Sequence, residues 1–299
     1  MPSPTVVRRV APDALLGPDS LSARLLGHPA TLLGGPRALL LQLAHPLVSA
    51  AVRSHSSFER DPFSRLARTF EVMIDISFGP PEVARASAAS LAAVHRQVKG
   101  TTKDGAAYAA QDPQLALWVH ATLVDTLLLT EKRYIGELDE DGRGRLYDES
   151  RLVAPRLGIP GKLIPRDLGE FRSYFEEELR VLVGSGVNED ALSVASRVLH
   201  PPGAPAFGPL AGVESRLAER LIEAATVDLG PPELCSAFGL PPHNSLSATA
   251  VFLDLGGLVS RSVSRWVPGA LLQPRNLARL TSWLAADDAE NAENAANAD

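Results

Sequence analysis

The chain lacks most features of secreted, membrane-spanning or nucleic-acid-binding proteins. Its one cysteine, Cys235, excludes an intramolecular disulfide and a four-cysteine zinc or iron–sulfur site. The 35 acidic and 29 basic residues give a net charge of −6 without a basic block, so neither nucleic acid nor an anionic membrane is expected as a partner. The most apolar window, residues 38–52, is too short for stable membrane insertion and contains Gln42, His45 and Pro46. We therefore expect a cytoplasmic protein.

Helix signals recur along the chain, whereas the alternation typical of half-buried strands is rare. Asp61-Pro62 and Asp112-Pro113 each combine an N-cap with a first-turn proline, and predict helices reaching about 78 and about 134. Gly34-Gly35-Pro36 opens a helix predicted over about 37–54, which Pro46 should kink near Gln42. Further helices are expected at about 81–100, 142–156, 167–183, 188–199, 213–227, 244–266 and 274–285.

These patterns predict an all-α fold. We expect one globular helical domain over residues 25–285, preceded by an N-terminal segment at 1–24 and followed by a disordered tail at 286–299, which has little to bury. The Pro- and Gly-rich stretch at 200–209 is the one candidate linker, and it is expected to join parts of the same domain.

Three polar clusters interrupt helices that are otherwise apolar, at residues 65–69, 94–100 and 118–125. Burying cations and imidazoles is costly unless a partner satisfies them, so a bound charged cofactor is the first explanation to consider. Arg65, Arg68 and Thr69 share one helix face and suit a carboxylate, such as a haem propionate, or a polarised dioxygen species. The alternative is a solvated basic stripe paired with nearby acids.

The histidines allow several roles. His95 follows a small-residue face that would let a flat group approach, so it is either an axial iron ligand or a helix C-terminal cap or half-buried core residue. His120 lies on an apolar helix face, where it is an iron ligand, an acid/base group or a core histidine. His45 is a further candidate for a functional histidine, with a structural role as the alternative. No HExxH or ExxH pair, GxSxG elbow or GxGxxG motif is present, which argues against zincins, carboxylate-bridged di-iron bundles, α/β-hydrolases and dinucleotide binding.

Six ordered motifs resemble one protein family: residues 32–46 (LLGGPRALLLQLAHP), 55–62 (HSSFERDP), 65–69 (RLART), 95–100 (HRQVKG), 108–113 (YAAQDP) and 118–123 (WVHATL). The family is a bacterial one once called a domain of unknown function (DUF2236). It is grouped with the rubber oxygenases, or latex-clearing proteins, and with the fungal oxygenase of mycophenolic acid biosynthesis. The resemblance covers residues 25–260.

The resemblance implies a globin-like helical packing around haem b and oxidative cleavage of carbon–carbon double bonds in isoprenoid chains. It places the axial iron ligand on His95 and a second downstream histidine on His120. Arg65 and Thr69 match the outer positions of an Arg-x-x-Lys-Thr segment that lines the haem pocket, while Arg68 stands where lysine stands in the rubber oxygenases. A guanidinium stays charged and is a poor iron ligand. His45 is expected on the distal side of the haem.

Together these observations predict a haem-b-dependent oxygenase that uses dioxygen on a small lipophilic, unsaturated substrate. Polymeric rubber is not expected as the substrate, because the rubber oxygenases are longer and secreted. The alternative is a non-catalytic haem- or lipophile-binding helical protein.

Overall fold

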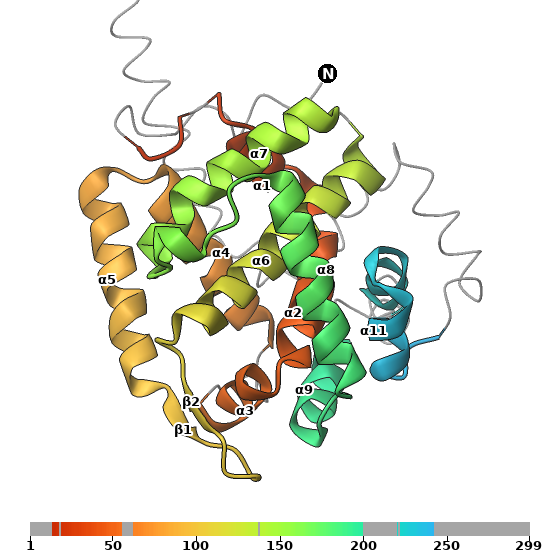
Figure 1. Ribbon diagram of the computed structural model, residues 1–299. Coiled ribbons are helices and arrows are strands. Elements are labelled where there is room, and N and C mark those ends of the chain that lie inside the picture. The colour runs from red at the N-terminus through yellow and green to blue at the C-terminus, as the bar shows by residue number, and fades with distance from the viewer. Residues whose placement is uncertain are drawn as a thin grey trace, which may run out of the picture.

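A computed structural model describes residues 14–17, 19–55, 62–136, 138–199, 220 and 222–241. The side chains of Pro29 and of residues 62–67 lie outside this description, as do the expected linker at 200–209, the helices expected at 244–266 and 274–285, and the tail. The described chain forms a predominantly all-α domain, as the sequence predicts (Figure 1). The division of the chain into an N-terminal segment at 1–24, a helical domain at 25–285 and a tail at 286–299 stays a prediction.

The helices and strands follow in chain order. They are α1 (Leu21–Leu26), the 3₁₀ helix η1 (Pro29–Gly34), α2 (Gly35–Ala44), α3 (Pro46–His55), α4 (Pro62–Phe78), α5 (Pro81–Gln97), β1 (Lys99–Thr101), β2 (Ala107–Ala109), α6 (Pro113–Thr130), the π-helical turn η3 (Glu131–Ile135), α7 (Glu140–Val153), the 3₁₀ turns η4 (Ala154–Leu157) and η5 (Gly161–Leu163), α8 (Leu168–Gly184), α9 (Glu189–Leu199) and α11 (Pro232–Ala237). Residues 222–229 are also helical.

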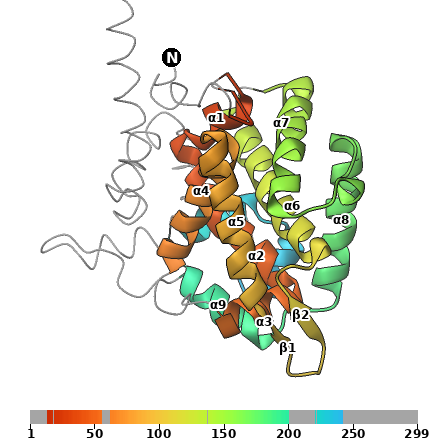
Figure 2. The same ribbon diagram turned by 90° about the vertical axis from the view of Figure 1, so that its left-hand side faces the viewer.

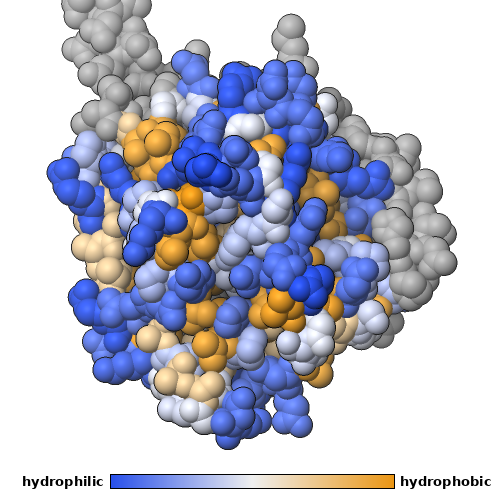
Figure 3. Space-filling model, in the orientation of Figure 1, coloured by the Kyte–Doolittle hydropathy of each residue, from blue (hydrophilic) through white to orange (hydrophobic). Residues whose placement is uncertain are grey.

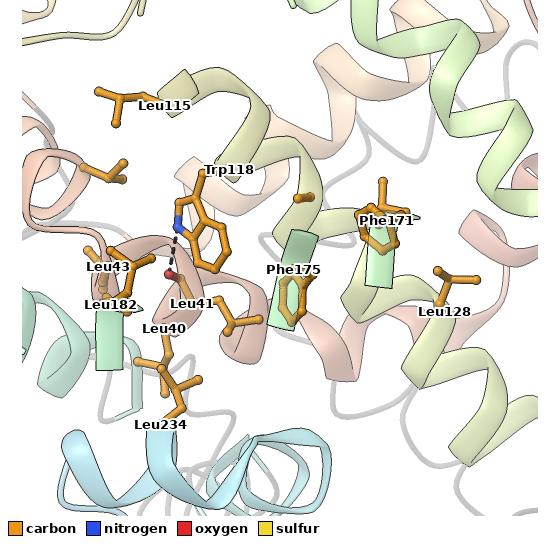
Figure 4. Close-up of a cluster of buried hydrophobic side chains, with 14 of the residues drawn as sticks. Leu40, Leu41, Leu43, Leu115, Trp118, Leu128, Phe171, Phe175, Leu182 and Leu234 are labelled. Carbon is orange, nitrogen blue, oxygen red and sulfur yellow. Dashed lines mark hydrogen bonds between the residues drawn. The ribbon is translucent and has the colours of Figure 1, made fainter. Parts of the chain in front are cut away.

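Helix α6 lies at the centre of the domain. It packs on α2 and α8, while α4 and α5 form a helical hairpin to one side (Figures 1 and 2). Trp118 of α6 is 1% exposed, stacks on Phe175 of α8 with 5.6 Å between ring centroids, and donates a hydrogen bond from Nε1 to the carbonyl oxygen of Leu41 at 3.2 Å (Figure 4). One aromatic side chain of α6 thereby joins three helices.

The molecular surface carries few large apolar side chains. The exposed ones among the described residues are Val94, Leu152, Val181 and Leu192. On the face seen in Figure 3, apolar residues form separate groups among hydrophilic ones. Among the helices described, none is both long and apolar enough to cross a membrane.

The N-cap predicted at Asp112 is confirmed, and Asp167 and Asn188 cap α8 and α9 in the same way. Side-chain oxygens of Asp112, Asp167 and Asn188 each accept a hydrogen bond at 2.8 Å from a backbone N–H two or three residues further on. These bonds satisfy amides that have no partner within the helix. Asp61 lies outside the described residues, and α4 begins at Pro62.

The helix expected over 37–54 is two helices, so the prediction of one kinked helix was wrong. His45 has φ −78° and ψ 118°, an extended conformation that separates α2 from α3. A residue that precedes proline is disfavoured in the helical region, because the proline ring collides with its backbone. Pro46 then starts a new helix in a new direction.

The helix expected to reach Gly100 ends at Gln97, and an unpredicted hairpin of β1 and β2 follows. Gly100 pairs with Tyr108 across this hairpin, and a Cβ at position 100 would lie 2.6 Å from the Tyr108 hydroxyl oxygen. Gly100 therefore makes room for the buried tyrosine instead of capping a helix. The Tyr108 hydroxyl lies 3.2 Å from Nε2 of His55, which ties the hairpin to the end of α3.

Candidate functional site

An apolar cavity of about 130 Å³ lies between α2, α4 and α6, with α1, η1 and α7 completing its walls. Its size is similar to that of an engineered apolar cavity of about 150 Å³ that binds benzene. The lining residues are Leu16, Ser22, Leu26, Thr31, Gly34, Gly35, Ala38, Leu39, Gln42, Thr69, Phe70, Met73, Ser77, His120, Leu123, Val124, Thr126, Leu127, Ser150 and Val153. No charged side chain belongs to this lining in the described part of the chain.

Two of the cavity walls come from regular positions of long helices. On α4, Thr69, Phe70, Met73 and Ser77 recur every three or four residues and form one face. On α6, His120 shares the wall with Leu123, Val124 and Leu127. The cavity therefore brings together residues of the first and third polar clusters of the sequence, Thr69 and His120.

His120 is the titratable side chain in the cavity wall. It is 6% exposed, and its Nδ1 is buried without a hydrogen-bond partner among the described residues. Burial lowers the pKa of His120 from 6.5 to about 4, against the opposing effect of the backbone carbonyl of Ser150. The imidazole is therefore neutral at physiological pH.

A buried arginine fixes α2 against α6 at one end of the cavity. Arg37 is 2% exposed, and its guanidinium donates to Asp125 Oδ2 at 2.6 Å, to Thr126 Oγ1 at 2.5 Å and to the carbonyl oxygen of Leu229 at 2.7 Å. Sequence reasoning did not assign it a role. The signal was present, since Arg37 is a lone cation that opens an otherwise apolar helix.

His95 and Arg65 are placed at the open end of the α4–α5 hairpin. Each helix has 17 residues, and only Gly79 and Pro80 connect them, so the C-terminal end of α5 lies level with the N-terminal turns of α4. His95 is half-buried in the last turn of α5 and does not line the cavity. Arg65 lies one helical turn before Thr69, and its side chain is outside the described part of the structure.

The other predicted site residues with described side chains lie outside the cavity lining. Arg68 is exposed on α4. His45 is half-buried between α2 and α3, where its Nδ1 accepts a hydrogen bond from the backbone N–H of Leu47 at 3.2 Å. Burial lowers the pKa of His45. Of the predicted residues whose side chains are described, the structure brings Thr69 and His120 together at the cavity and places His45, Arg68 and His95 outside its lining.

The described residues contain no group of three or more histidine, cysteine, aspartate or glutamate side chains that could hold a metal ion. Such a group is what a metal centre built from protein side chains alone requires. Haem iron differs, because the porphyrin supplies four ligands and the protein adds one or two axial ones.

Two relatives match part of the chain. They are proteins described as uncharacterised, Mb2261 of Mycobacterium bovis and Rv2237 of Mycobacterium tuberculosis, each 26% identical over 168 residues. The match covers 54% of this chain and 66% of theirs, slightly less than two thirds of the relatives' length. No solved structure matched the chain.

A family model provides the broader match. The model is described as the catalytic domain of the ER-bound oxygenase mpaB/B′ and rubber oxygenase family, and it matches residues 23–261. This range covers most of the chain and contains all six motifs as well as every residue of the cavity wall except Leu16 and Ser22. The chain therefore belongs to the mpaB/B′ and rubber oxygenase catalytic-domain family.

Proposed function

We propose that this protein is a haem-b-dependent oxygenase that uses dioxygen on a small lipophilic, unsaturated substrate. Membership of the family supports an oxygenase-type role. The observation that carries the proposal is the apolar cavity, whose wall holds a buried, neutral imidazole with an unpartnered nitrogen. A cavity with this lining favours an uncharged, apolar ligand over a sugar or a phosphate ester.

The donor set at the open end of the α4–α5 hairpin fits haem chemically. An imidazole is the common protein ligand of haem iron, and guanidinium groups pair with carboxylates such as propionates. His95 and Arg65 lie at the same level of two adjacent helices, and Thr69 follows one turn later at the cavity wall. We propose that His95 would bind the haem iron, that Arg65 and Thr69 would pair with its propionates or with dioxygen, and that Arg68 is a further cation at the surface.

The cavity side chains have separate tasks in this proposal. When bound, haem supplies the iron chemistry that activates dioxygen toward a carbon–carbon double bond. Phe70, Met73 and Leu123 hold the apolar part of the substrate and exclude water. His120 stays neutral in the cavity wall, and His45, at the junction of α2 and α3, is proposed as a further catalytic residue.

We also propose that the protein works in the cytoplasm. Cys235 is buried and not paired in a disulfide, which is compatible with a reducing compartment. The negative net charge supports a small-molecule substrate over nucleic acid as the partner.

Haem content is the first test of this function. The full chain is produced with added haem, and the Soret band and haem-to-protein ratio are measured for the wild type, His95→Ala and His55→Ala. His55 is an exposed imidazole at the end of α3 and serves as the matched control. We expect one haem per chain in the wild type and control, and loss of haem in His95→Ala with the helical circular dichroism retained. A wild type that takes up no haem would refute the proposal, and loss of haem from His120→Ala alone would move the ligand to α6.

Turnover separates the enzyme from a non-catalytic haem- or lipophile-binding protein. The haem-loaded chain is incubated with a short isoprenoid alkene under isotopically labelled dioxygen, and carbonyl products are detected by mass spectrometry. Labelled carbonyl products are expected from the wild type. Two arginines of the α4–α5 hairpin provide a matched pair of variants. Arg65→Ala should reduce turnover strongly, whereas Arg85→Ala, at an exposed position of α5, should not. A stable haem complex that produces no carbonyls from alkenes would favour the binding protein.

A further inference from the structure

We propose that the end of α7 and the segment after it dock this protein on the surface of an anionic lipid bilayer. The partner is defined by its chemistry, a layer of negatively charged headgroups over hydrocarbon. The docking surface consists of cations and of apolar side chains that are exposed or half-buried. They are Arg145, Leu152, Arg156, Leu157, Lys162, Leu163 and Ile164.

Positive charge is concentrated in the segment 151–166, which spans the end of α7, η4 and η5. It contains no aspartate or glutamate, and its four cations are Arg151, Arg156, Lys162 and Arg166. The segment therefore carries a charge of +4 within a chain whose net charge is −6. The expectation that an anionic membrane is not a partner came from the net charge, which averages over the whole surface and conceals this local excess.

Three cations of the docking surface are available to an outside partner. Arg145, Arg156 and Lys162 are exposed, and none of them forms an ion pair within the described ranges of the chain. A guanidinium or an ammonium in this state can donate hydrogen bonds to a phosphate group without giving up a bond inside the protein.

The four acids that flank the segment are engaged within the protein. Asp148 pairs with Arg151 at 3.1 Å, and Glu170 pairs with the arginine that ends the segment. Glu149 accepts hydrogen bonds from two backbone N–H groups of α1, and Asp167 caps α8. These carboxylates therefore do not neutralise the three available cations.

An exposed leucine lies between two of these cations. Leu152 is 55% exposed on α7, with Arg145 two helical turns before it and Arg156 one turn after it, at the start of η4. Residues spaced by whole turns lie on one side of a helix. Leu152 can thus enter the headgroup region while the two guanidiniums pair with phosphates, as on other surfaces that lie in a membrane interface.

The remaining apolar side chains of the docking surface gather beside α7. Leu157, Leu163 and Ile164 are half-buried and pack against one small buried cluster that includes Ile159. Lys162, the third available cation, directly precedes Leu163. The cluster holds η4 and η5 together, so both turns contribute to the same part of the surface.

The position of the cavity favours a bilayer over an acidic protein as the partner. Ser150 and Val153, on the same turn of α7 as Leu152, line the apolar cavity. A bilayer docked at Leu152 is then separated from the cavity by one helix, which gives a lipid-soluble molecule a short path from the membrane. This step rests on the proposed function, because it takes the cavity as the substrate site. The cytoplasmic leaflet carries anionic lipids, which agrees with the proposed location.

Vesicle binding tests the docking surface. Binding of the full chain as purified is measured by cosedimentation at low ionic strength, with vesicles of phosphatidylcholine alone and with vesicles that contain about 30% phosphatidylglycerol. We expect the anionic vesicles to bind at least about tenfold more tightly than the neutral ones, and about 0.5 M salt to remove most of this difference.

Two pairs of variants separate the docking surface from the overall charge. Each cation at an anionic surface contributes about fivefold to binding, so Arg156→Gln combined with Lys162→Gln should weaken it by about 25-fold. Lys99→Gln combined with Lys132→Gln removes the same charge from exposed positions elsewhere and should change binding by less than about twofold.

The apolar contribution has its own matched control. Leu152→Asn should weaken binding to anionic vesicles by about three- to tenfold, because a polar side chain gains little from the interface. Leu192→Asn replaces another exposed leucine, on α9, and should bind as the wild type. Circular dichroism verifies that each variant is folded.

Each outcome decides the proposal. Equal binding to neutral and anionic vesicles, an equal loss in the two double variants, or an unchanged Leu152→Asn would overturn it. So would a wild type that binds no vesicles, which would leave an acidic protein as the partner of these cations. The wild-type series needs no variant and stays decisive if a variant does not fold. The assay requires neither haem nor turnover, so failure of the function proposed above would be seen separately.

Discussion

Acidification should destabilise this protein through His120. The folded protein keeps this imidazole neutral, with its pKa lowered to about 4, whereas the unfolded chain titrates at the ordinary value of 6.5. Between these values the unfolded state binds a proton that the folded state does not, so stability is lost as the pH falls from about 6.5 to about 4. At about 1.4 kcal/mol per pH unit, the full loss is about 3 kcal/mol, of which about 2 kcal/mol falls between pH 7 and pH 5.

Urea denaturation of the full chain, followed by circular dichroism at about pH 7 and about pH 5, measures this loss. Carboxylates and other histidines also titrate, so the quantity of interest is the difference between the wild type and His120→Phe. The variant should lose about 2 kcal/mol less than the wild type over this interval. His55→Gln, at an exposed position at the end of α3, is the control for replacing a histidine.

An equal loss in the wild type and His120→Phe would show that the imidazole is not held neutral by burial. That result would refute the electrostatic description of the cavity. If His120→Phe disturbs the packing, His120→Leu provides the same comparison with a smaller side chain.

Three further predictions concern the framework around the cavity, each measured by urea denaturation. Arg37→Met should lower the free energy of unfolding by about 3–5 kcal/mol, because it removes the guanidinium that lies 2.6 Å from Asp125 Oδ2. A loss below about 1 kcal/mol would contradict the anchoring role of Arg37. Gly34→Ala should cost about 1–3 kcal/mol, since a Cβ there would lie 2.5 Å from a threonine methyl of α6. Gly144→Ala in α7, with open space around it, should be neutral or stabilising. A stabilising Gly34→Ala would show that η1 and α6 are not closely packed. Glu131→Gln should lower the free energy of unfolding by about 2 kcal/mol or more. The fully buried carboxylate accepts hydrogen bonds from the Leu138 N–H at 2.8 Å and from Nε of Arg143 in α7 at 3.0 Å. An unchanged urea midpoint would show that these bonds contribute little.

Local features of the sequence were enough to place most helices. The starts at Pro113, Leu168 and Glu189 follow from the residues just before them, since an N-cap bond joins groups two or three positions apart. The apolar character of α6 also follows from its sequence, and a helix that is apolar nearly all round must be buried.

Features that depend on distant residues required the tertiary structure. The break at His45 has a local cause in Pro46, but a kink and a break in a helix have the same sequence signal, and only the packing of α3 chose between them. The hairpin after Gln97 depends on a glycine that makes room for Tyr108 across two short strands.

The candidate site shows the same division between local and distant causes. The sequence alone determined which residues carry the family resemblance and that polar side chains interrupt α4, α5 and α6. It did not determine which histidine is buried, because burial depends on what neighbouring helices place around it. The tertiary structure decided that Thr69 and His120, 51 positions apart in the chain, line one cavity, and that His95 lies outside its lining. The residues that share a helix face follow from their spacing in the sequence, whereas a cavity forms only where the faces of separate helices leave a gap in the packing.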